Sequence, residues 1–142
     1  MNDKSITEIS PLAAWKILQS EPRATVLDVR TSMEYEYVGH PVGAINVPWQ
    51  KLPGGEVNGD FVADVCKTLS AKHGEDADIL SLPLLMICRS GKRSRAAADK
   101  LINHDFKKVF NIDEGFEGDL DEEKHRGRIN GWRYHGLPWE QT

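Results

Sequence analysis

One cysteine of the chain lies where an apolar run meets a basic segment. Cys88 directly follows the apolar residues 82–87, and the next six residues read Arg-Ser-Gly-Lys-Arg-Ser. An apolar run of this length is typical of a central strand in a parallel sheet that is covered on both faces. The alanine-rich, amphipathic stretch 92–104 predicts a helix immediately after the loop. The sequence therefore predicts a thiol at the junction of a buried strand and a helix N-terminus.

This position favours the ionised, nucleophilic form of a cysteine. Loop N–H groups and the helix dipole stabilise a thiolate, and neighbouring cations act in the same direction. The cations close to Cys88 in the sequence are Arg89, Lys92, Arg93 and Arg95. The same N–H and guanidinium groups suit the oxygens of a small anion. Gly91 supplies the positive φ or the close backbone approach that a tight anion-binding loop needs.

Two other loop motifs that bind anions fit less well. A phosphate-binding P-loop requires a glycine five residues before its Gly-Lys pair and a Ser or Thr after it, but Met86 and Arg93 stand at these positions. A cysteine-dependent phosphatase of the Cx5R type requires an arginine six residues beyond its cysteine, where this chain has Ser94 and places Arg95 one residue later. The P-loop is excluded, and a phosphatase or arsenate reductase stays open as an alternative.

The rest of the chain predicts the frame that holds this loop. Ser10-Pro11 is a helix start, Pro22 ends that helix, and residues 61–73 form a second amphipathic helix. Strands are expected at 24–30, 44–48 and 107–112, in addition to 82–87. Such alternation predicts an α/β domain with a mainly parallel sheet and a ligand site beyond the carboxyl ends of its strands. The tail from Asp113 onward is expected to form a helix and irregular coil that pack back on the domain.

Several other residues with reactive side chains are better explained by structure than by chemistry. Asp28 and Arg30 are expected to tie loops together through hydrogen bonds, and His40 to serve a turn. Cys66 lies on an apolar helical stripe and is interpreted as a core residue, with a resolving thiol as the alternative. Trp139 is interpreted as a packing residue, with a cover over the site or a partner surface as the alternative.

Composition limits the classes of function. The 142 residues are 39% hydrophobic and 28% charged, which is ordinary for one globular domain, here residues 1–142 with a core at about 10–139. A formal charge of −4 argues against nucleic-acid binding, and the chain has neither an apolar run that could cross a membrane nor a signal-type N-terminus. The scattered histidines predict no metal site. We expect a cytoplasmic protein.

Three segments, in this order, resemble the single-domain rhodanese family. They are residues 26–30 with Glu34 and 39–48, the loop Cys88-Arg89-Ser90-Gly91-Lys92-Arg93-Ser94, and residues 109–117. The resemblance extends from about Ser10 to Trp139. It implies a rhodanese-like α/β fold, with a central, mainly parallel five-stranded sheet and helices on both faces.

The resemblance also implies a function. The Cys88 thiolate would attack the outer sulfur of thiosulfate, release sulfite, and pass the sulfur from a persulfide to cyanide or to a thiol or protein acceptor, with no cofactor or metal. Arg89, Lys92 and Arg93 would hold the sulfonate, with Arg93 as the main cation, and the hydroxyls of Ser90 and Ser94 would donate hydrogen bonds. The loop lacks the Cys-Gly-Ser-Gly-Val-Thr form of mercaptopyruvate sulfurtransferases, which favours thiosulfate as donor. A non-catalytic sulfur carrier or interaction module is the remaining alternative.

Overall fold

The computed structural model of the chain describes residues 5–51 and 54–142. Residues 1–4 and 52–53 of the predicted domain lie outside the described residues, and residues 1–4 belong to the segment on which the expectation about a signal peptide was based. Within the described ranges, no helix combines the length and the apolar character that crossing a bilayer would require. The same residues contain no group of three or more His, Cys, Asp or Glu side chains arranged to hold a metal ion.

A central sheet of five parallel strands carries the fold. The strands are β1 (Thr7–Ile9), β2 (Thr25–Asp28), β4 (Ile45–Asn46), β5 (Leu84–Ile87) and β6 (Val109–Ile112). Their spatial order is β1-β6-β5-β2-β4, and every neighbouring pair is parallel. β5 therefore lies in the middle of the sheet, with Leu84 paired to Thr25 on one side and to Val109 on the other. The predicted mainly parallel, five-stranded α/β architecture is confirmed.

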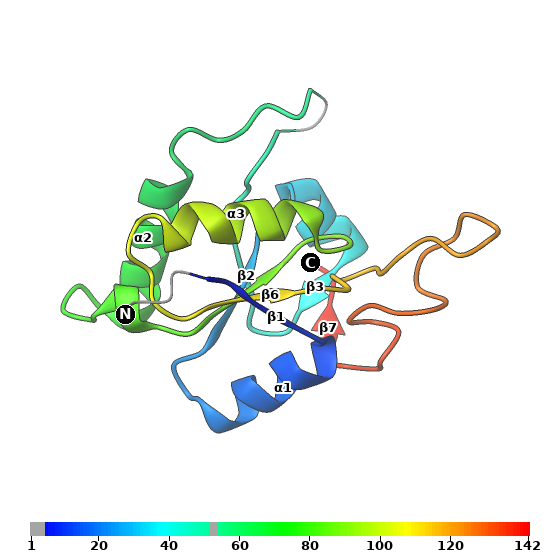
Figure 1. Cartoon of the computed structure of the whole chain (residues 1–142), viewed down its shortest axis with the longest axis horizontal. Coiled ribbons are helices and arrows are strands. Elements are labelled where there is room, and N and C mark those ends of the chain that lie inside the picture. The colour runs from blue at the N-terminus through cyan, green and yellow to red at the C-terminus, as the bar shows by residue number, and fades with distance from the viewer. Residues whose placement is uncertain (1–4, 52–53) are drawn as a thin grey trace.

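Helices cover both faces of this sheet (Figure 1). α1 (Pro11–Ser20) lies on one face, and α2 (Phe61–His73) and α3 (Lys92–Ile102) lie on the other. The Ser10 hydroxyl accepts a hydrogen bond from the N–H of Ala13 at 3.1 Å, so the predicted cap of α1 is formed. The two layers define two apolar cores, because alternate residues of a strand point to opposite faces.

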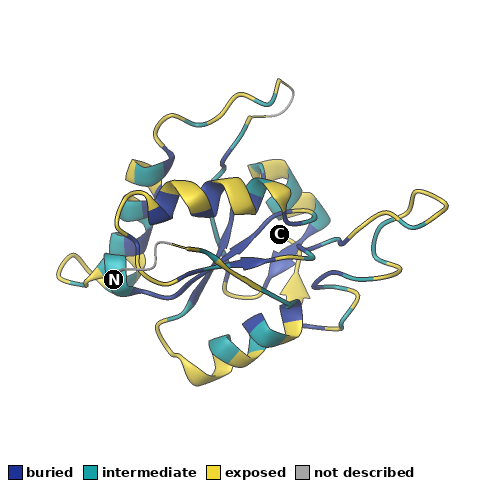
Figure 2. Ribbon diagram, viewed as in Figure 1, coloured by how far each residue is buried: buried dark blue, intermediate teal, exposed yellow. Residues whose placement is uncertain are grey.

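The central strand divides its side chains between these two cores. Leu84 and Met86 of β5 pack with the apolar residues of α2 and α3, whereas Leu85 and Ile87 pack with Ala14 of α1. All four residues of β5 are fully buried, and the sheet forms the buried centre of the molecule in Figure 2. The strand that leads to Cys88 is thus held on both edges and on both faces.

Four short elements complete the fold: two helical turns and a pair of two-residue strands. Residues Glu34–Val38 form one turn of π-helix, η1, and residues Ile79–Ser81 form a 3-10 turn, η2. β3 (His40–Pro41) pairs antiparallel with β7 (Trp139–Glu140), which brings the end of the chain back to the carboxyl edge of β2. The sequence did not predict η1 or the β3–β7 pair.

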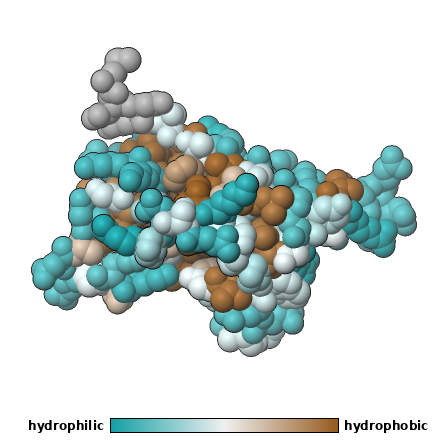
Figure 3. Space-filling model, turned by 90° about the horizontal axis from the view of Figure 1, so that it is seen from below, coloured by the Kyte–Doolittle hydropathy of each residue, from teal (hydrophilic) through white to brown (hydrophobic). Residues whose placement is uncertain are grey.

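The helix predicted in the tail is wrong. Residues 113–142 form turns and the short strand β7, and they contain no helix. Gly115, Gly118 and Gly131 have positive φ, a backbone conformation that ends regular helices. The tail does pack back on the domain, because Phe116 and Trp132 are fully buried in the core on the α1 side. Between them, residues 118–131 form a largely hydrophilic protrusion (Figures 1 and 3).

Candidate active site

The cysteine loop is a tight turn from β5 into α3. Cys88 follows Ile87, the last residue of β5, and is 1% exposed. Gly91 caps α3 with a φ of 102°, and a Cβ on it would overlap the carbonyl oxygen of Asp113. Its N–H donates a hydrogen bond to Cys88 Sγ at 3.1 Å. Gly91 therefore combines a positive φ, a close backbone approach and a hydrogen bond to the sulfur, which no other residue type can do here without strain.

In the backbone of the loop, several N–H groups are free to bind a ligand, whereas the carbonyl groups of Cys88 and Arg89 are hydrogen-bonded within the protein. The carbonyl oxygen of Cys88 accepts a hydrogen bond from Phe116 N–H at 2.8 Å, and that of Arg89 accepts from the N–H groups of Glu117 and Gly118 at 3.0 and 3.1 Å. The loop N–H groups without an acceptor among the described residues include those of Arg89, Ser90, Lys92 and Arg93. Together with the start of α3, they form a site that is suited to a negatively charged group.

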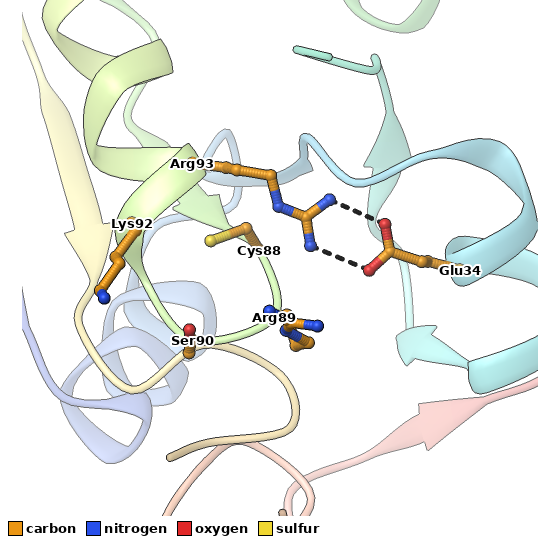
Figure 4. Close-up of a pocket in the computed structure, with 6 residues that line it drawn as sticks. All are labelled: Glu34, Cys88, Arg89, Ser90, Lys92 and Arg93. Atoms are coloured by element: carbon orange, nitrogen blue, oxygen red, sulfur yellow. Dashed lines mark hydrogen bonds and ion pairs between the residues drawn. The ribbon is translucent and has the colours of Figure 1, made fainter. Parts of the chain in front are cut away.

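A pocket of about 340 Å³ opens above the sulfur. The residues that line it are Glu34, Cys88, Arg89, Ser90, Lys92 and Arg93. Figure 4 shows Arg93 and Glu34 side by side, with Cys88 and Arg89 nearby. Five of the seven residues predicted from the loop motif thus line one pocket. The other two, Gly91 and Ser94, lie beside the sulfur, with Gly91 N and Ser94 Oγ at 3.1 and 3.3 Å from Sγ.

Glu34, which comes from η1, holds Arg93 in a two-point ion pair. The two guanidinium Nη atoms donate to the two carboxylate oxygens at 2.7 and 2.9 Å (Figure 4). Burial opposes the ionisation of Glu34, but the hydrogen bond and the charge of Arg93 outweigh it and hold the pKa of Glu34 below its ordinary value. The hydrogen bond that Arg93 donates to Glu34 likewise raises the pKa of Arg93. Both side chains are ionised in this arrangement.

The three pocket cations are therefore not equivalent. The guanidinium of Arg93 is neutralised by Glu34, whereas Arg89 and Lys92 form no ion pair with any described residue. Arg95 points elsewhere and pairs with Glu8 at 2.9 Å on the surface. The positive charge that remains unpaired at the pocket comes from Arg89 and Lys92. Counting charges in the sequence could not reveal this, because Glu34 lies 59 residues away from Arg93 in the chain.

Ser94 and Asn111 form a buried polar pair beneath the sulfur. Ser94 Oγ lies 3.3 Å from Cys88 Sγ and 2.6 Å from Asn111 Oδ1. Asn111, on β6, donates from Nδ2 to Glu8 Oε1 at 2.7 Å and to the carbonyl of Gly91 at 3.1 Å. The sequence analysis did not identify Asn111 or Glu8. A polar residue inside the otherwise apolar segment 109–112 was the one available signal.

The residues that were assigned structural roles make structural contacts. Asp28 and Arg30 form a fully buried ion pair at 2.6 Å, and Arg30 also donates to the carbonyl of Gly39 at 2.5 Å. The Arg30 guanidinium lies 4.6 Å from the ring centre of Phe116. His40 Nδ1 lies 2.8 Å from the carbonyl of Tyr35, whose ring stacks on the imidazole. These contacts support the wall of the pocket behind η1.

Cys66 and Trp139 lie outside the pocket. Cys66 is a free cysteine on α2 that packs against the core on the α2 and α3 side, and burial raises the pKa of its thiol. Trp139 is 41% exposed, and its ring packs edge-on against Phe116. It also fills the space in front of Gly39, where a Cβ would meet the indole at 2.7 Å. Its main contacts are therefore those of a packing residue.

Residues 10–122 match the Rhodanese-like domain family, and the chain belongs to this family. The uncharacterized protein RC0915 of Rickettsia conorii is 30% identical over 141 residues, which cover 96% of this chain and 98% of that protein. The thiosulfate sulfurtransferase GlpE of Actinobacillus pleuropneumoniae is 29% identical over 137 residues, with 96% and 95% covered. The crystal structure of Rv0390 from M. tuberculosis is 35% identical, with a TM-score of 0.81 over 97% of this chain and 100% of that chain.

Proposed function

We propose that the protein is a sulfurtransferase that carries sulfane sulfur as a persulfide on Cys88, and that residues 1–142 act as one rhodanese domain. The observation that carries the proposal is the position of Cys88 Sγ. It accepts the Gly91 N–H at 3.1 Å and lies under a pocket with open N–H groups and two unpaired cations. The similarity to GlpE, a thiosulfate sulfurtransferase by name, supports the same assignment.

In the loading step, the Cys88 thiolate attacks the outer sulfur of thiosulfate. A bond forms between Sγ and this sulfur, the sulfur–sulfur bond of thiosulfate breaks, and sulfite leaves with the electron pair. Charge is conserved, because a thiolate and a dianion give a persulfide anion and a dianion. Arg89 and Lys92 attract the sulfonate, and the open N–H groups stabilise the negative charge that arrives on the outer sulfur. Arg93, fixed by Glu34, forms one wall of the pocket.

In the discharge step, the carbon of cyanide or the sulfur of an acceptor thiolate attacks the outer sulfur of the persulfide. The Cys88 thiolate is the leaving group, and it returns to the hydrogen bond from Gly91. The same backbone donors therefore serve both halves of a two-step cycle. The acceptor is either a small nucleophile or a thiol on another protein.

Phosphate chemistry is less well supported by the same geometry. Ser94 occupies the position where a Cx5R phosphatase has its arginine, and it is buried next to Sγ. Arg95, one residue later, pairs with Glu8 instead of lining the pocket. An aryl phosphatase assay on the same preparation tests this alternative directly.

The deciding experiment combines turnover with intact mass. Wild type should form thiocyanate from thiosulfate and cyanide, and after thiosulfate alone it should gain the mass of one sulfur atom that cyanide removes. Cys88→Ala should lose both signals, whereas the matched control Cys66→Ala should keep both. If Cys88→Ala keeps its rate or gains the sulfur, the proposal is wrong. A stable persulfide without turnover would identify a sulfur carrier rather than an enzyme.

A further inference from the structure

The hydroxyl of Ser94 has one proton and three acceptors within reach. Its Oγ lies 2.6 Å from Asn111 Oδ1, 3.3 Å from Cys88 Sγ and 3.3 Å from the carbonyl of Gly91. A hydroxyl can donate to only one of these at a time. Ser94 and Asn111 are both buried, so water does not supply a substitute donor at their contact. The two acceptors that do not receive the Ser94 proton need hydrogen bonds from other donors.

The orientation of Asn111 decides where this proton lies. Its Nδ2 faces the Glu8 carboxylate at 2.7 Å and the Gly91 carbonyl at 3.1 Å, and both of these groups only accept hydrogen bonds. The amide therefore cannot be turned around, and Oδ1 must face Ser94. At 2.6 Å this contact is the shortest that Ser94 makes, so the hydroxyl proton lies between Ser94 and Asn111. A lone pair of Ser94 Oγ is then directed at the sulfur.

An oxygen lone pair of Ser94 that faces the sulfur stabilises some chemical states of Cys88 and destabilises others. A protonated thiol donates its S–H to Ser94 Oγ, and the inner sulfur of a persulfide is neutral. A free thiolate carries its charge on Sγ and gains a second hydrogen bond, beside the one from Gly91, if the Ser94 proton turns toward it. If the hydroxyl turns to supply that proton, Asn111 Oδ1 loses its donor while only 1% of the residue is exposed. An unsatisfied buried acceptor is unfavourable, so Asn111 opposes the charged inner sulfur.

We propose that Asn111 is a positioning residue that, by holding the Ser94 proton, shifts Cys88 from the free thiolate toward the sulfur-loaded form. This inference rests on the proposed sulfur transfer. In the reaction of the Cys88 thiolate with thiosulfate to give the persulfide and sulfite, the negative charge moves from the inner to the outer sulfur. In the loaded form the outer sulfur would extend into the pocket toward the open N–H groups of the loop, where Asn111 does not oppose its charge.

Glu8 completes the arrangement from the edge strand β1. Its carboxylate fixes the amide of Asn111 from below, and it is held in turn by Arg95 at 2.9 Å. The Glu8 side chain is 38% exposed, so it can be replaced without opening the core. Glu8→Ala frees the amide of Asn111 to turn its Nδ2 toward Ser94, which would release the hydroxyl proton to the sulfur. Substitution of the buried Asn111 and substitution of the half-exposed Glu8 should therefore both release the Ser94 proton to the sulfur.

The test compares thiol alkylation with sulfur loading. Asn111→Leu, which keeps the size but removes the acceptor, should raise the rate of Cys88 alkylation by iodoacetamide at neutral pH about tenfold. It should also lower the equilibrium constant for loading, measured by intact mass in thiosulfate and sulfite mixtures, by a similar factor. Glu8→Ala should move both quantities in the same directions, and it covers the case in which Asn111→Leu does not fold. Ser94→Ala should not slow alkylation, because in wild type the Ser94 proton is held by Asn111 and is not donated to the sulfur.

The double variant separates proton control from simple loosening of the loop. In Asn111→Leu with Ser94→Ala, the faster alkylation should disappear, because no hydroxyl proton remains to be released. If the double variant stays as fast as Asn111→Leu, or if Asn111→Leu alone leaves alkylation and loading unchanged, the proposal is overturned. A failure of the proposed function would look different, since wild type would then gain no sulfur at all while its alkylation still responded to Asn111.

Discussion

Glu34 and Arg93 face each other across the wall of the Cys88 pocket and are joined by two parallel hydrogen bonds of 2.7 and 2.9 Å. One residue comes from the π-helical turn after β2, and the other from the first turn of α3. This geometry is the strong, two-point form of an arginine–carboxylate pair. It cancels one positive charge at a site that is proposed to take an anion, so the balance of charge in the pocket depends on Glu34.

Removing the charge of Glu34 should strengthen the binding of an anionic donor. Glu34→Gln leaves the guanidinium of Arg93 without its counter-ion, so we expect the KM for thiosulfate to fall about threefold. The kcat should change little, because Glu34 does not contact Cys88. The matched control is Glu36→Gln, which changes the same charge on the exposed side of η1. Steady-state rates of thiocyanate formation measure both, and an unchanged or higher KM for Glu34→Gln would contradict the expectation.

The same pair should make stability depend on pH in the acid range. Arg93 holds the pKa of Glu34 below 4.5 in the folded chain, so the unfolded chain binds the proton first as the pH falls. The contribution of Glu34 is complete above 4.5 and is lost as the pH falls through the lower, folded value. Urea unfolding at a series of pH values should show Glu34→Gln to be less stable than wild type by about 1 kcal/mol near neutrality. The difference should shrink as the pH falls below 4.5 and vanish once Glu34 is protonated in the folded chain as well, and a constant difference would argue against the pair.

The two cations without a counter-ion should determine donor binding. Arg89→Met and Lys92→Met each remove one unpaired charge from the pocket, and each should raise the KM for thiosulfate about three- to tenfold. The control Lys100→Met removes a charge from the last turn of the same helix, away from the pocket. It should leave the KM within error, because exposed charges at that distance are screened by salt. Equal effects of all three variants would show a general effect of net charge.

Gly91 should tolerate substitution less well than other glycines with positive φ. Gly127→Ala places a Cβ in open space, so it should cost only the backbone strain of about 1–2 kcal/mol. Gly91→Ala adds an overlap with the Asp113 carbonyl, and the total should reach about 3 kcal/mol or more. Chemical denaturation of the two variants gives the comparison. Similar losses of stability in both would show that the loop can move away from Asp113.

Sequence patterns predicted the main elements of the frame well because these patterns reflect local physics. The run that becomes β5 is apolar throughout since it is buried on both faces, and the Ser10 cap is decided within one helical turn. The β1 strand, Thr7–Ile9, was missed because its three residues have no strand pattern of their own and are ordered by pairing with β6. The predicted tail helix was wrong because several glycines of the tail, among them Gly118, Gly127 and Gly131, adopt positive φ, which a regular helix does not allow.

The residues of the candidate site likewise fall into those that the sequence predicted and those that it did not. Cys88 and the loop residues around it were predicted as a group, because their spacing along the chain determines the turn that places them. Glu34 and Asn111 contact the loop only after the sheet has brought β2 and β6 to either side of β5. Their roles are long-range, and neither has a local pattern. The relative importance of Arg93, Arg89 and Lys92 could not be read from the sequence for this reason.

The loop is fastened through main-chain atoms, since the carbonyls of Cys88 and Arg89 are held by the N–H groups of residues 116–118. The side chains of Arg89, Ser90, Lys92 and Arg93 line the pocket, and they take no part in these main-chain hydrogen bonds. Exchange of any of them alters what the pocket recognises without releasing the turn that carries the sulfur. A lineage built on this frame can therefore change the anion that its pocket accepts by a few substitutions at these positions, with Cys88 and the fold retained.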